Sequence, residues 1–334
     1  MQPSEFDTAF DETPFDGLTP ETVLDAVESL GLRADGRLLT LNSFENRVYQ
    51  VGLEDGACVA KFYRPHRWSD AQILEEHAFT RELANAEVPV VAPMVCGGAT
   101  LHRFGAYRFA LFARRGGRAP ELELPGVREQ IGRFIGRIHA HGARAAFESR
   151  PALDVESFGV ASREFLLRSP FLPDTLRDAW ASVSEQALAG VRRAWARAGD
   201  VAQLRLHGDC HGGNIMWTDA GAHFVDFDDS RSGPAIQDLW MLLPSGTDDP
   251  RPALAQVLDG YRAFMRFDAR ELHLIEALRT LRLLHHSAWL AHRWRDPAFP
   301  AAFPWFDTAR YWEDRVLELR EQIAAMDESP DWRI

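Results

Sequence analysis

Two short polar segments carry the residue types and the spacing that phosphoryl transfer needs. The first, residues 207–214, reads His-Gly-Asp-Cys-His-Gly-Gly-Asn and places Asn214 five residues after Asp209. The second, residues 224–229, reads Phe-Val-Asp-Phe-Asp-Asp and places Asp226 twelve residues after Asn214. A kinase uses one carboxylate to orient and deprotonate the attacking hydroxyl, and an amide oxygen and a second carboxylate to hold the metal. Asp209, Asn214 and Asp226 match these roles in order, and their oxygen ligands favour Mg²⁺ over softer metals.

Two other interpretations of the first segment remain open. An Asx-rich turn between strands would use its Asp and Asn side chains only to bond backbone amides. A zinc site would take His207, Cys210 and His211 as ligands, but it lacks a fourth ligand and a second Cys/His pair at zinc-finger spacing. Because both segments occur in order and lie beside apolar, strand-like residues, the sequence favours phosphoryl transfer.

A strand-like run that ends at Lys61 reads Val-Ala-Lys and is similar to the kinase strand whose lysine holds the α- and β-phosphates. That lysine needs a glutamate on the following helix, where Glu75 and Glu76 are both available. At 100° per residue, Glu76 falls in the middle of the apolar stripe, whereas Glu75 falls on the side of Glu82. A glutamate centred on an apolar face needs an internal cation, so Glu76 is the expected partner of Lys61. The alternative is that both glutamates are surface residues.

The phosphate loop of such a lobe would be residues 42–48, Asn-Ser-Phe-Glu-Asn-Arg-Val. This loop has no glycine, unlike the Gly-x-Gly-x-x-Gly-x-Val loop of protein kinases. A tight turn of Asn and Ser can still direct backbone N–H groups and the Ser43 hydroxyl at phosphate oxygens. Val48 fits the position where a β-branched residue covers the base. An ordinary Asn-rich hairpin turn remains the alternative to a nucleotide loop.

The composition limits the kind of protein that carries these segments. The chain has 334 residues, a formal net charge of −12 and 46% apolar residues, which excludes a disordered or fibrous chain. An acidic chain also lacks the electrostatic footprint of a non-specific nucleic-acid binder. Its three cysteines are widely spaced and suggest no disulfide framework. With no signal-peptide pattern and no apolar run of membrane-spanning length, we expect a cytoplasmic protein that binds neither nucleic acid nor membrane.

The element pattern changes along the chain and predicts two lobes. Residues 1–18 read as an acidic tail, residues 19–115 as a β-rich lobe and residues 116–334 as a mainly helical lobe. The expected strands are at 38–41, 47–53, 57–63, 88–96 and 107–113, with helices from Thr19 and over 69–86. A small β insert is expected between 204 and 227. The pattern predicts an α+β fold of two lobes with a cleft between them. From the candidate residues above, we expect ATP in the first lobe and the catalytic loop and substrate cleft in the second.

Other polar residues have less certain roles. His139 closes an apolar helix face and is interpreted as a hydrogen-bonded core histidine. Asp238 lies at the start of a helix, where a buried carboxylate could tie down the backbone of the catalytic loop. The histidines at 285, 286 and 292 fit either helix packing or a rim of the substrate cleft. No role is assigned to Asp228 and Asp229.

Taken together, the two catalytic segments resemble those of the phosphotransferases related to aminoglycoside and choline kinases, which share the bilobal fold of protein kinases. Further stretches are similar to one branch, the bacterial stress response kinase A family. These stretches are residues 41–50, 59–65, 72–77, 206–211, 237–243 and 296–300. The resemblance runs from about residue 19 to residue 315, and it is specific because an Asn-Ser loop replaces the glycine loop in both.

This resemblance implies an ATP-dependent Ser/Thr protein kinase, cytoplasmic and monomeric, that limits damage and cell death under oxidative or envelope stress. Carried over residue by residue, Asp209 is the proton acceptor and Ser43 lies at the ATP site. Asn214 and Asp226 bind Mg²⁺. The chain has Asp-Phe-Asp in place of Asp-Phe-Gly and so lacks the glycine that lets protein kinases flip this segment. We therefore expect no regulation by such a flip.

The acceptor stays open at this stage. A Ser or Thr hydroxyl of a protein and a small hydroxylated molecule, such as an amino alcohol, a sugar or an antibiotic, both suit the motif. A third hypothesis is a non-catalytic regulator that only binds nucleotide. Such a regulator would lack a catalytic residue, whereas this chain keeps the full set of Lys61, Asp209, Asn214 and Asp226.

Overall fold

A five-stranded antiparallel sheet builds the N-terminal part of the computed structural model, which describes residues 6, 13–219, 221–244 and 249–328. In spatial order its strands are β1 (Ala34–Thr40), β2 (Arg47–Leu53), β3 (Gly56–Phe62), β5 (Tyr107–Ala113) and β4 (His102–Phe104). A two-residue turn joins β2 to β3, which confirms the hairpin expected at Asp55-Gly56. The register pairs Val48 with Lys61, so these two side chains lie on the same face of the sheet.

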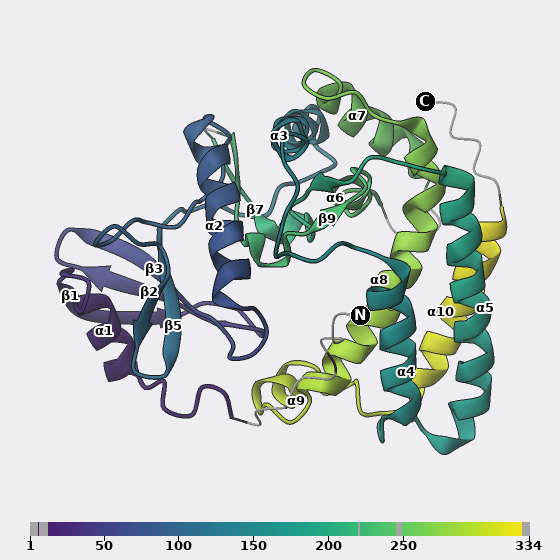
Figure 1. Cartoon of the computed structure of the whole chain (residues 1–334), viewed down its shortest axis with the longest axis horizontal. Helices are drawn as coiled ribbons and strands as arrows, with labels where there is room; N and C mark the ends of the chain where they lie inside the picture. The colour runs from purple at the N-terminus through teal and green to yellow at the C-terminus, as the bar shows by residue number, and fades with distance from the viewer. Residues whose placement is uncertain (1–5, 7–12, 220, 245–248, 329–334) are drawn as a thin grey trace.

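Two helices cover the sheet, one on each side (Figure 1). Helix α1 (Pro20–Glu28) begins after the N-cap Thr19, as predicted, and its Val23 and Val27 pack in one core with Phe62 of β3. Helix α2 (Asp70–Asn85) begins with the predicted capping box, in which Ser69 and Gln72 bond each other's backbone N–H. Because successive strand residues face opposite sides, Lys61 points away from the α1 side that Phe62 faces.

The predicted strand at 88–96 is absent from the described part of the chain, and the segment is extended with isolated bridges only. The physical reason is its two prolines, Pro89 and Pro93, which lack the N–H that a strand ladder needs. The segment instead crosses to the C-terminal part, where Pro89 O accepts from Phe224 N (2.7 Å) and Val91 N donates to Phe224 O (3.0 Å). This extended segment thus reaches a residue two positions before Asp226.

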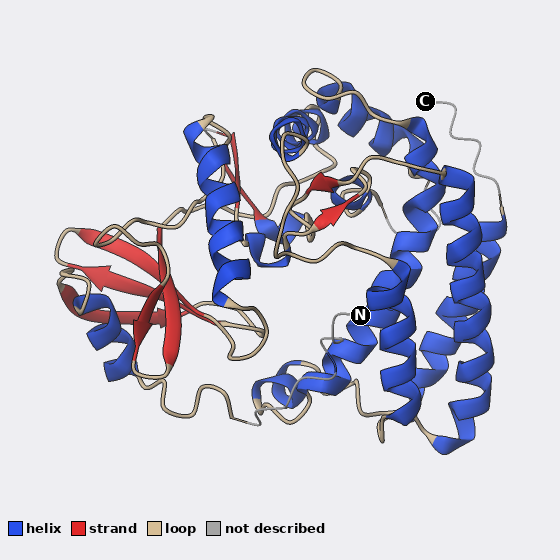
Figure 2. Cartoon of the chain, viewed as in Figure 1, coloured by secondary structure: helices blue, strands red, loops and turns tan. Residues whose placement is uncertain are grey.

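Helices make up most of the C-terminal part, as expected (Figure 2). They are α3 (Val127–Gly142), α4 (Ala161–Arg168), α5 (Asp174–Ala198), α6 (Gln237–Trp240), α7 (Arg251–Tyr261), α8 (Ile275–Arg293), α9 (Ala298–Ala302) and α10 (Ala309–Asp327), with single-turn segments η2 (Glu156–Val160) and η5 (Ala269–Leu274). Helices α4, α5, α8 and α10 form a bundle at the end farthest from the sheet (Figure 1). Trp180 and Trp312 meet inside it with ring centroids 6.2 Å apart.

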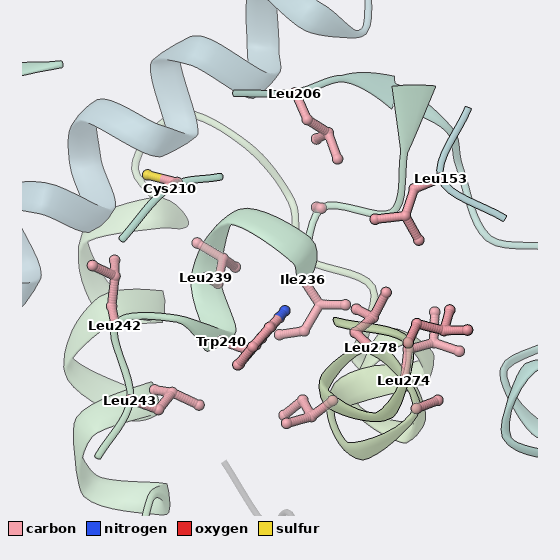
Figure 3. Close-up of a cluster of buried hydrophobic side chains, with 14 of the residues drawn as sticks. Leu153, Leu206, Cys210, Ile236, Leu239, Trp240, Leu242, Leu243, Leu274 and Leu278 are labelled. Atoms are coloured by element: carbon pink, nitrogen blue, oxygen red, sulfur yellow. The ribbon is translucent and has the colours of Figure 1, made fainter. Parts of the chain in front are cut away.

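The small β insert lies between the sheet and the bundle and carries both polar segments. Its strands are β6 (Leu204–Arg205), β7 (Ile215–Thr218), β8 (Gly221–Phe224) and β9 (Ser232–Gly233). Beneath it, Cys210 is buried in a cluster with Leu206, Leu239 and Leu242 (Figure 3). The predicted α+β bilobal fold is confirmed. Most of the predicted acidic tail, residues 1–5 and 7–12, lies outside the described residues.

Candidate active site

The segment 207–214 is anchored by one buried carboxylate. Asp238 accepts hydrogen bonds from His207 N (2.8 Å) and Gly208 N (2.9 Å), and its Oδ2 lies 3.1 Å from His139 Nε2. His139 also bonds the Tyr261 hydroxyl at 3.0 Å. Asp238 and His139 are both almost completely buried, so this network fixes the backbone just before Asp209. The core role predicted for His139 and the anchoring role predicted for Asp238 are thereby confirmed.

The two polar segments lie against each other because of a glycine. Gly208 has φ 88°, and a Cβ there would lie 2.1 Å from the Asp229 carbonyl oxygen. Any other residue would push the segments apart or strain the backbone. The His207 ring adds a direct link, since its Nε2 donates to the Val225 carbonyl at 2.9 Å.

Asn214 completes the connection between the predicted base and the predicted metal ligand. Its side-chain amide nitrogen donates to the Asp209 carbonyl (2.9 Å), and its own carbonyl accepts from Val225 N (3.0 Å), directly before Asp226. Asp226 has φ 58°, a left-handed conformation that Asp tolerates better than most residues. Its side chain keeps 55% exposure. The structure therefore brings Asp209, Asn214 and Asp226 together at one site between the lobes.

Lys61 reaches this site from β3. Its ammonium lies 2.8 Å from Asp226 Oδ1 and 3.0 Å from Asp228 Oδ1. Burial works to lower the pKa of Lys61, but the charges of Asp226 and Asp228 outweigh it and hold that pKa well above its usual value. The side chain therefore stays charged and ties the sheet to the loop that follows β8.

Glu76 does not make the ion pair expected of it. Among the residues that the structure describes, Lys61 pairs with Asp226 and Asp228, and the cation nearest Glu76 is Arg150, at 3.7 Å. Glu76 is buried as the helix phase predicted. Burial raises its pKa to about 7 although the charges of Lys61 and Arg150 work to lower it, so the carboxyl is only partly ionised at neutral pH. Asp228, to which the sequence assigned no role, takes the place predicted for Glu76.

Arg150 links α2 to the loop after β8, and no sequence pattern pointed to it. Its Nε donates to Gln72 O in α2 (2.8 Å) and its Nη1 donates to Asp228 O (2.6 Å). Glu75, expected on the solvent side, instead accepts from the backbone N–H groups of Ser149 (2.9 Å) and Arg150 (2.7 Å). The helix is thus fastened to the site through Arg150 rather than through a Lys61–Glu76 pair.

Both carboxylate oxygens of Asp209 have partners. Arg282 Nη1 from α8 lies 2.5 Å from Oδ1, and His211 Nε2 lies 3.4 Å from Oδ2. Burial works to raise the pKa of Asp209, but the His211 hydrogen bond and the Arg282 charge outweigh it and hold that pKa well below its usual range. Arg282 lies in no recognised motif and 73 positions away from Asp209, so no sequence pattern pointed to this contact.

The loop over 42–48 folds on itself by side-chain hydrogen bonds in place of glycine. Ser43 Oγ donates to Asn46 O (3.1 Å), and Asn46 Oδ1 accepts from Arg64 N in the chain that follows β3 (3.0 Å). Ser43 is half-buried, while Val48 lies beside Lys61 on the sheet. These positions are compatible with the nucleotide roles predicted for Ser43 and Val48.

Two carboxylates fasten this loop to the C-terminal helices. Glu45 lies 3.1 Å from Arg293 of α8, and its pKa is lowered to about 2 because the charges of Arg67, Arg293 and Arg64 outweigh its burial. Asp296, between α8 and α9, lies 3.1 Å from Arg47 and 2.5 Å from Arg64. These ion pairs therefore connect the phosphate-loop candidate of the N-terminal lobe to the helices of the C-terminal lobe.

The donor set fits a hard divalent cation that also binds a nucleotide. The described residues contain no group of three or more His, Cys, Asp or Glu side chains that could hold a metal ion. The zinc interpretation consequently finds no support there, and Cys210 is buried in an apolar cluster. With its amide nitrogen already donated to Asp209 O, Asn214 has its amide oxygen to offer beside Asp226. Two protein oxygens plus phosphate oxygens and water is the usual ligand set of Mg²⁺ at such sites.

Comparisons with known proteins agree with this geometry. The model of the phosphotransferase enzyme family matches residues 38–275. Stress response kinase A of Escherichia coli K12 is 43% identical over 317 residues, which cover 95% of this chain and 96% of the relative. A Salmonella typhimurium relative named serine/threonine protein kinase RdoA has the same identity and coverage. No described helix has the length and apolar character to cross a membrane.

Solved structures place the fold in the same group. Amicoumacin kinase hAmiN, in complex with AMP-PNP, Ca²⁺ and Ami, aligns with a TM-score of 0.70 over 91% of this chain and 93% of its own, at 19% identity. A microcompartment-associated aminopropanol kinase aligns with a TM-score of 0.68 over 91% of this chain and 96% of its own, at 17% identity. The chain therefore belongs to the phosphotransferase enzyme family and, within it, to the stress response kinase A family.

Proposed function

We propose that the protein transfers the γ-phosphoryl group of ATP to a Ser or Thr hydroxyl of another protein, with Mg²⁺ as the metal. The observation that carries this proposal is the hydrogen-bonded connection from Asp209 through Asn214 to the residue before Asp226. It holds Asp209, the proposed base, and Asn214 and Asp226, the proposed metal ligands, at one site, which supports phosphoryl transfer. The relative named as a serine/threonine protein kinase supports a protein acceptor.

Each residue then has a defined task in the reaction. Asp209 orients the acceptor hydroxyl and receives its proton as the hydroxyl oxygen bonds to the γ-phosphorus. The bond from that phosphorus to the β–γ bridging oxygen breaks, and ADP leaves with the electron pair. Lys61 would contact the α- and β-phosphates, with Asp228 keeping its ammonium in place when Asp226 serves as a metal ligand.

The nucleotide and the metal are held by both lobes in this proposal. Asn214 and Asp226 bind Mg²⁺, which neutralises charge on the phosphates when it is bound. Val48 covers the base from the sheet, and the loop that contains Ser43 lies over the phosphates. Glu76 lies beside this site, 3.7 Å from Arg150, and its charge also acts on Lys61.

A small-molecule acceptor is the second candidate, and the fold neighbours favour it. Those structures carry the names of an amicoumacin kinase and an aminopropanol kinase, so this architecture accommodates small hydroxylated acceptors. The two candidates share the same chemistry at Asp209 and differ only in what approaches it.

The test uses the purified full chain with γ-labelled ATP and Mg²⁺. The acceptors are a mixed protein substrate, a set of Ser and Thr peptides, and a panel of amino alcohols, sugars and aminoglycosides. We expect label on Ser or Thr, at rates well above those with the small molecules. Asp209→Asn should abolish the transfer, whereas Asp219→Asn, in the exposed turn after β7, is the matched control and should retain it.

Transfer to a small alcohol alone would replace the protein-kinase proposal with the second candidate. No transfer to any acceptor, with ATP still bound, would support the non-catalytic regulator instead. We also propose that the chain works as a monomer, which sedimentation of the purified protein would check.

A further inference from the structure

Arg282 covers one of the two carboxylate oxygens of the proposed base. It projects from α8, and its Nη1 lies 2.5 Å from Asp209 Oδ1. His211 Nε2 lies 3.4 Å from the other carboxylate oxygen. Asp209 keeps 23% side-chain exposure, Arg282 keeps 45% and His211 keeps 41%, so both partners are more exposed than the carboxylate. Arg282 makes the shorter contact, and a hydroxyl that is to reach Oδ1 must displace its guanidinium.

The pairing also occupies the oxygen that must receive the proton. Asp209 Oδ1 already accepts a charged hydrogen bond from Arg282, and charged hydrogen bonds are the stronger ones in proteins. Moving Arg282 off Asp209 would uncover that oxygen.

The other arginines near Arg282 are compensated by carboxylates of their own. Arg279 lies 3.0 Å from Glu276 on the same helix, and Arg315 pairs with Glu318 on α10. His286 is close enough for the charges of Arg282 and Arg315 to add to burial and lower its pKa to about 4, so it is neutral at neutral pH. Among the described residues, Asp209 is the one carboxylate with which Arg282 forms an ion pair.

A guanidinium in this position prefers an anionic ligand. Its planar donors fit a carboxylate or a phosphate in a bidentate manner, and its exposure lets it rotate toward an incoming group. A cationic acceptor would meet like charge at the entrance to the base. An acceptor with a carboxylate near its hydroxyl would instead offer Arg282 a second partner.

We propose that Arg282 selects acceptors in which an acidic residue flanks the Ser or Thr hydroxyl. The flanking carboxylate takes the guanidinium as the hydroxyl approaches, and this exchange frees Asp209 Oδ1 to receive the hydroxyl proton. Arg282 is thus a specificity-determining residue that couples recognition of the acceptor to the uncovering of the base. The inference rests on the proposed function, because it requires a peptide hydroxyl as the acceptor.

The experiment compares three Ser peptides of equal length whose flanking positions carry Glu, Gln or Lys. For the unmodified protein we expect kcat/KM to be about tenfold higher for the Glu peptide than for the Gln peptide, the size of one charge-assisted hydrogen bond. The Lys peptide should be the poorest. Arg282→Gln should bring the kcat/KM values of the Glu and Gln peptides to within about twofold to threefold of each other, whatever its own overall rate.

A control variant and a binding measurement distinguish a loss of acceptor recognition from a general loss of activity. Arg279→Gln, on the same helix but paired with Glu276, should keep the preference of the unmodified protein. Peptides with Ala in place of Ser serve as competitive inhibitors, so that binding is measured without transfer. The Glu form should inhibit about tenfold better than the Gln form, and Arg282→Gln should remove that difference.

The outcomes distinguish this inference from the proposed function. If the unmodified protein phosphorylates all three peptides equally, or if Arg282→Gln keeps the preference, the role of Arg282 is wrong while the kinase proposal stands. If it phosphorylates only small alcohols, or nothing, the kinase proposal fails and this inference fails with it.

Discussion

The Asp228 carboxylate lies 3.0 Å from the Lys61 ammonium, where the sequence predicted a glutamate of the following helix. Asp228 is buried and also pairs with Arg67, so it is held from two sides. Asp226 forms the second ion pair to Lys61 and is much more exposed. The lysine can thus release Asp226 to a metal ion and still keep one buried anionic partner.

This arrangement predicts how Lys61 couples to its neighbours. Lys61→Ala and Asp228→Asn should each raise the KM for ATP, and the double variant should cost less than the sum of the two. The coupling expected for a contacting charge pair is about 0.5–3 kcal/mol. Lys61→Ala combined with Glu76→Gln should show a smaller coupling, because the two charges interact without forming an ion pair. Strong coupling to Glu76 and none to Asp228 would show that the roles assigned to these two carboxylates are reversed.

Glu76 should make the stability of the protein depend on pH. Burial raises its pKa from 4.5 to about 7, so between these values the folded state binds more protons than the unfolded state. The contribution of this group is complete below about pH 4.5 and declines as the pH rises through 7, by roughly 3 kcal/mol in total. Glu76→Gln should therefore gain stability relative to the unmodified protein as the pH rises, which urea unfolding at pH 6 and pH 8 would measure. An equal difference between the two proteins at both pH values would contradict the raised pKa.

The sequence predicted the elements that depend on local signals. The N-cap Thr19, the capping box of Ser69 and Gln72, and the Asp55-Gly56 turn act over a few residues and were all confirmed. The strand predicted at 88–96 was wrong. The apolar residues of this segment favoured a strand, but Pro89 and Pro93 lack the N–H groups that a strand ladder needs. The strand β4 was missed because it has only three residues.

The part of the site whose residues are spaced as in a kinase motif could be predicted from the sequence. Asp209, Asn214 and Asp226 lie on one short insert, so the chain itself brings them near each other. The partners of Lys61 and Asp209 could not be predicted in the same way. Asp228 and Arg282 are set by the packing of β3 and α8 against that insert, and this packing has no local signature. The helix phase located Glu76 in the core correctly, but burial alone does not say which cation is nearest.

The catalytic segment should depend on Asp238. Asp238→Asn replaces one of two acceptor oxygens with a donor and leaves a buried N–H of His207 or Gly208 without a partner. The expected loss of stability is about 1–3 kcal/mol, accompanied by a fall in kcat. Thermal unfolding and turnover at saturating ATP measure the two effects. The matched control is Asp219→Asn, which should change neither, and a stable Asp238→Asn protein with full turnover would argue against the anchoring role.

The connection between the phosphate loop and the C-terminal helices should be sensitive to Asp296. This buried carboxylate neutralises Arg47 and Arg64, so Asp296→Ala leaves both cations without it and should cost roughly 3–5 kcal/mol. Asp296→Asn keeps the shape and should mainly raise the KM for ATP, because the loop is held less firmly. Asp35→Asn, whose carboxylate forms an exposed pair with Arg37, is the control and should leave the KM unchanged. An unchanged KM for ATP in Asp296→Asn would show that nucleotide binding does not depend on this anchoring of the loop.

In the proposed reaction, Asp209 is the base, and Asp226 binds the metal ion that accompanies ATP. The most direct measurement is the rate of phosphoryl transfer by Asp209→Asn beside its affinity for ATP in the presence of Mg²⁺. Because the Asp209 carboxylate acts on the acceptor hydroxyl, we predict a rate loss of about 10²–10⁴ with ATP affinity largely unchanged. A variant that keeps more than about a third of the normal rate, far above the loss expected for a missing base, would contradict the assignment.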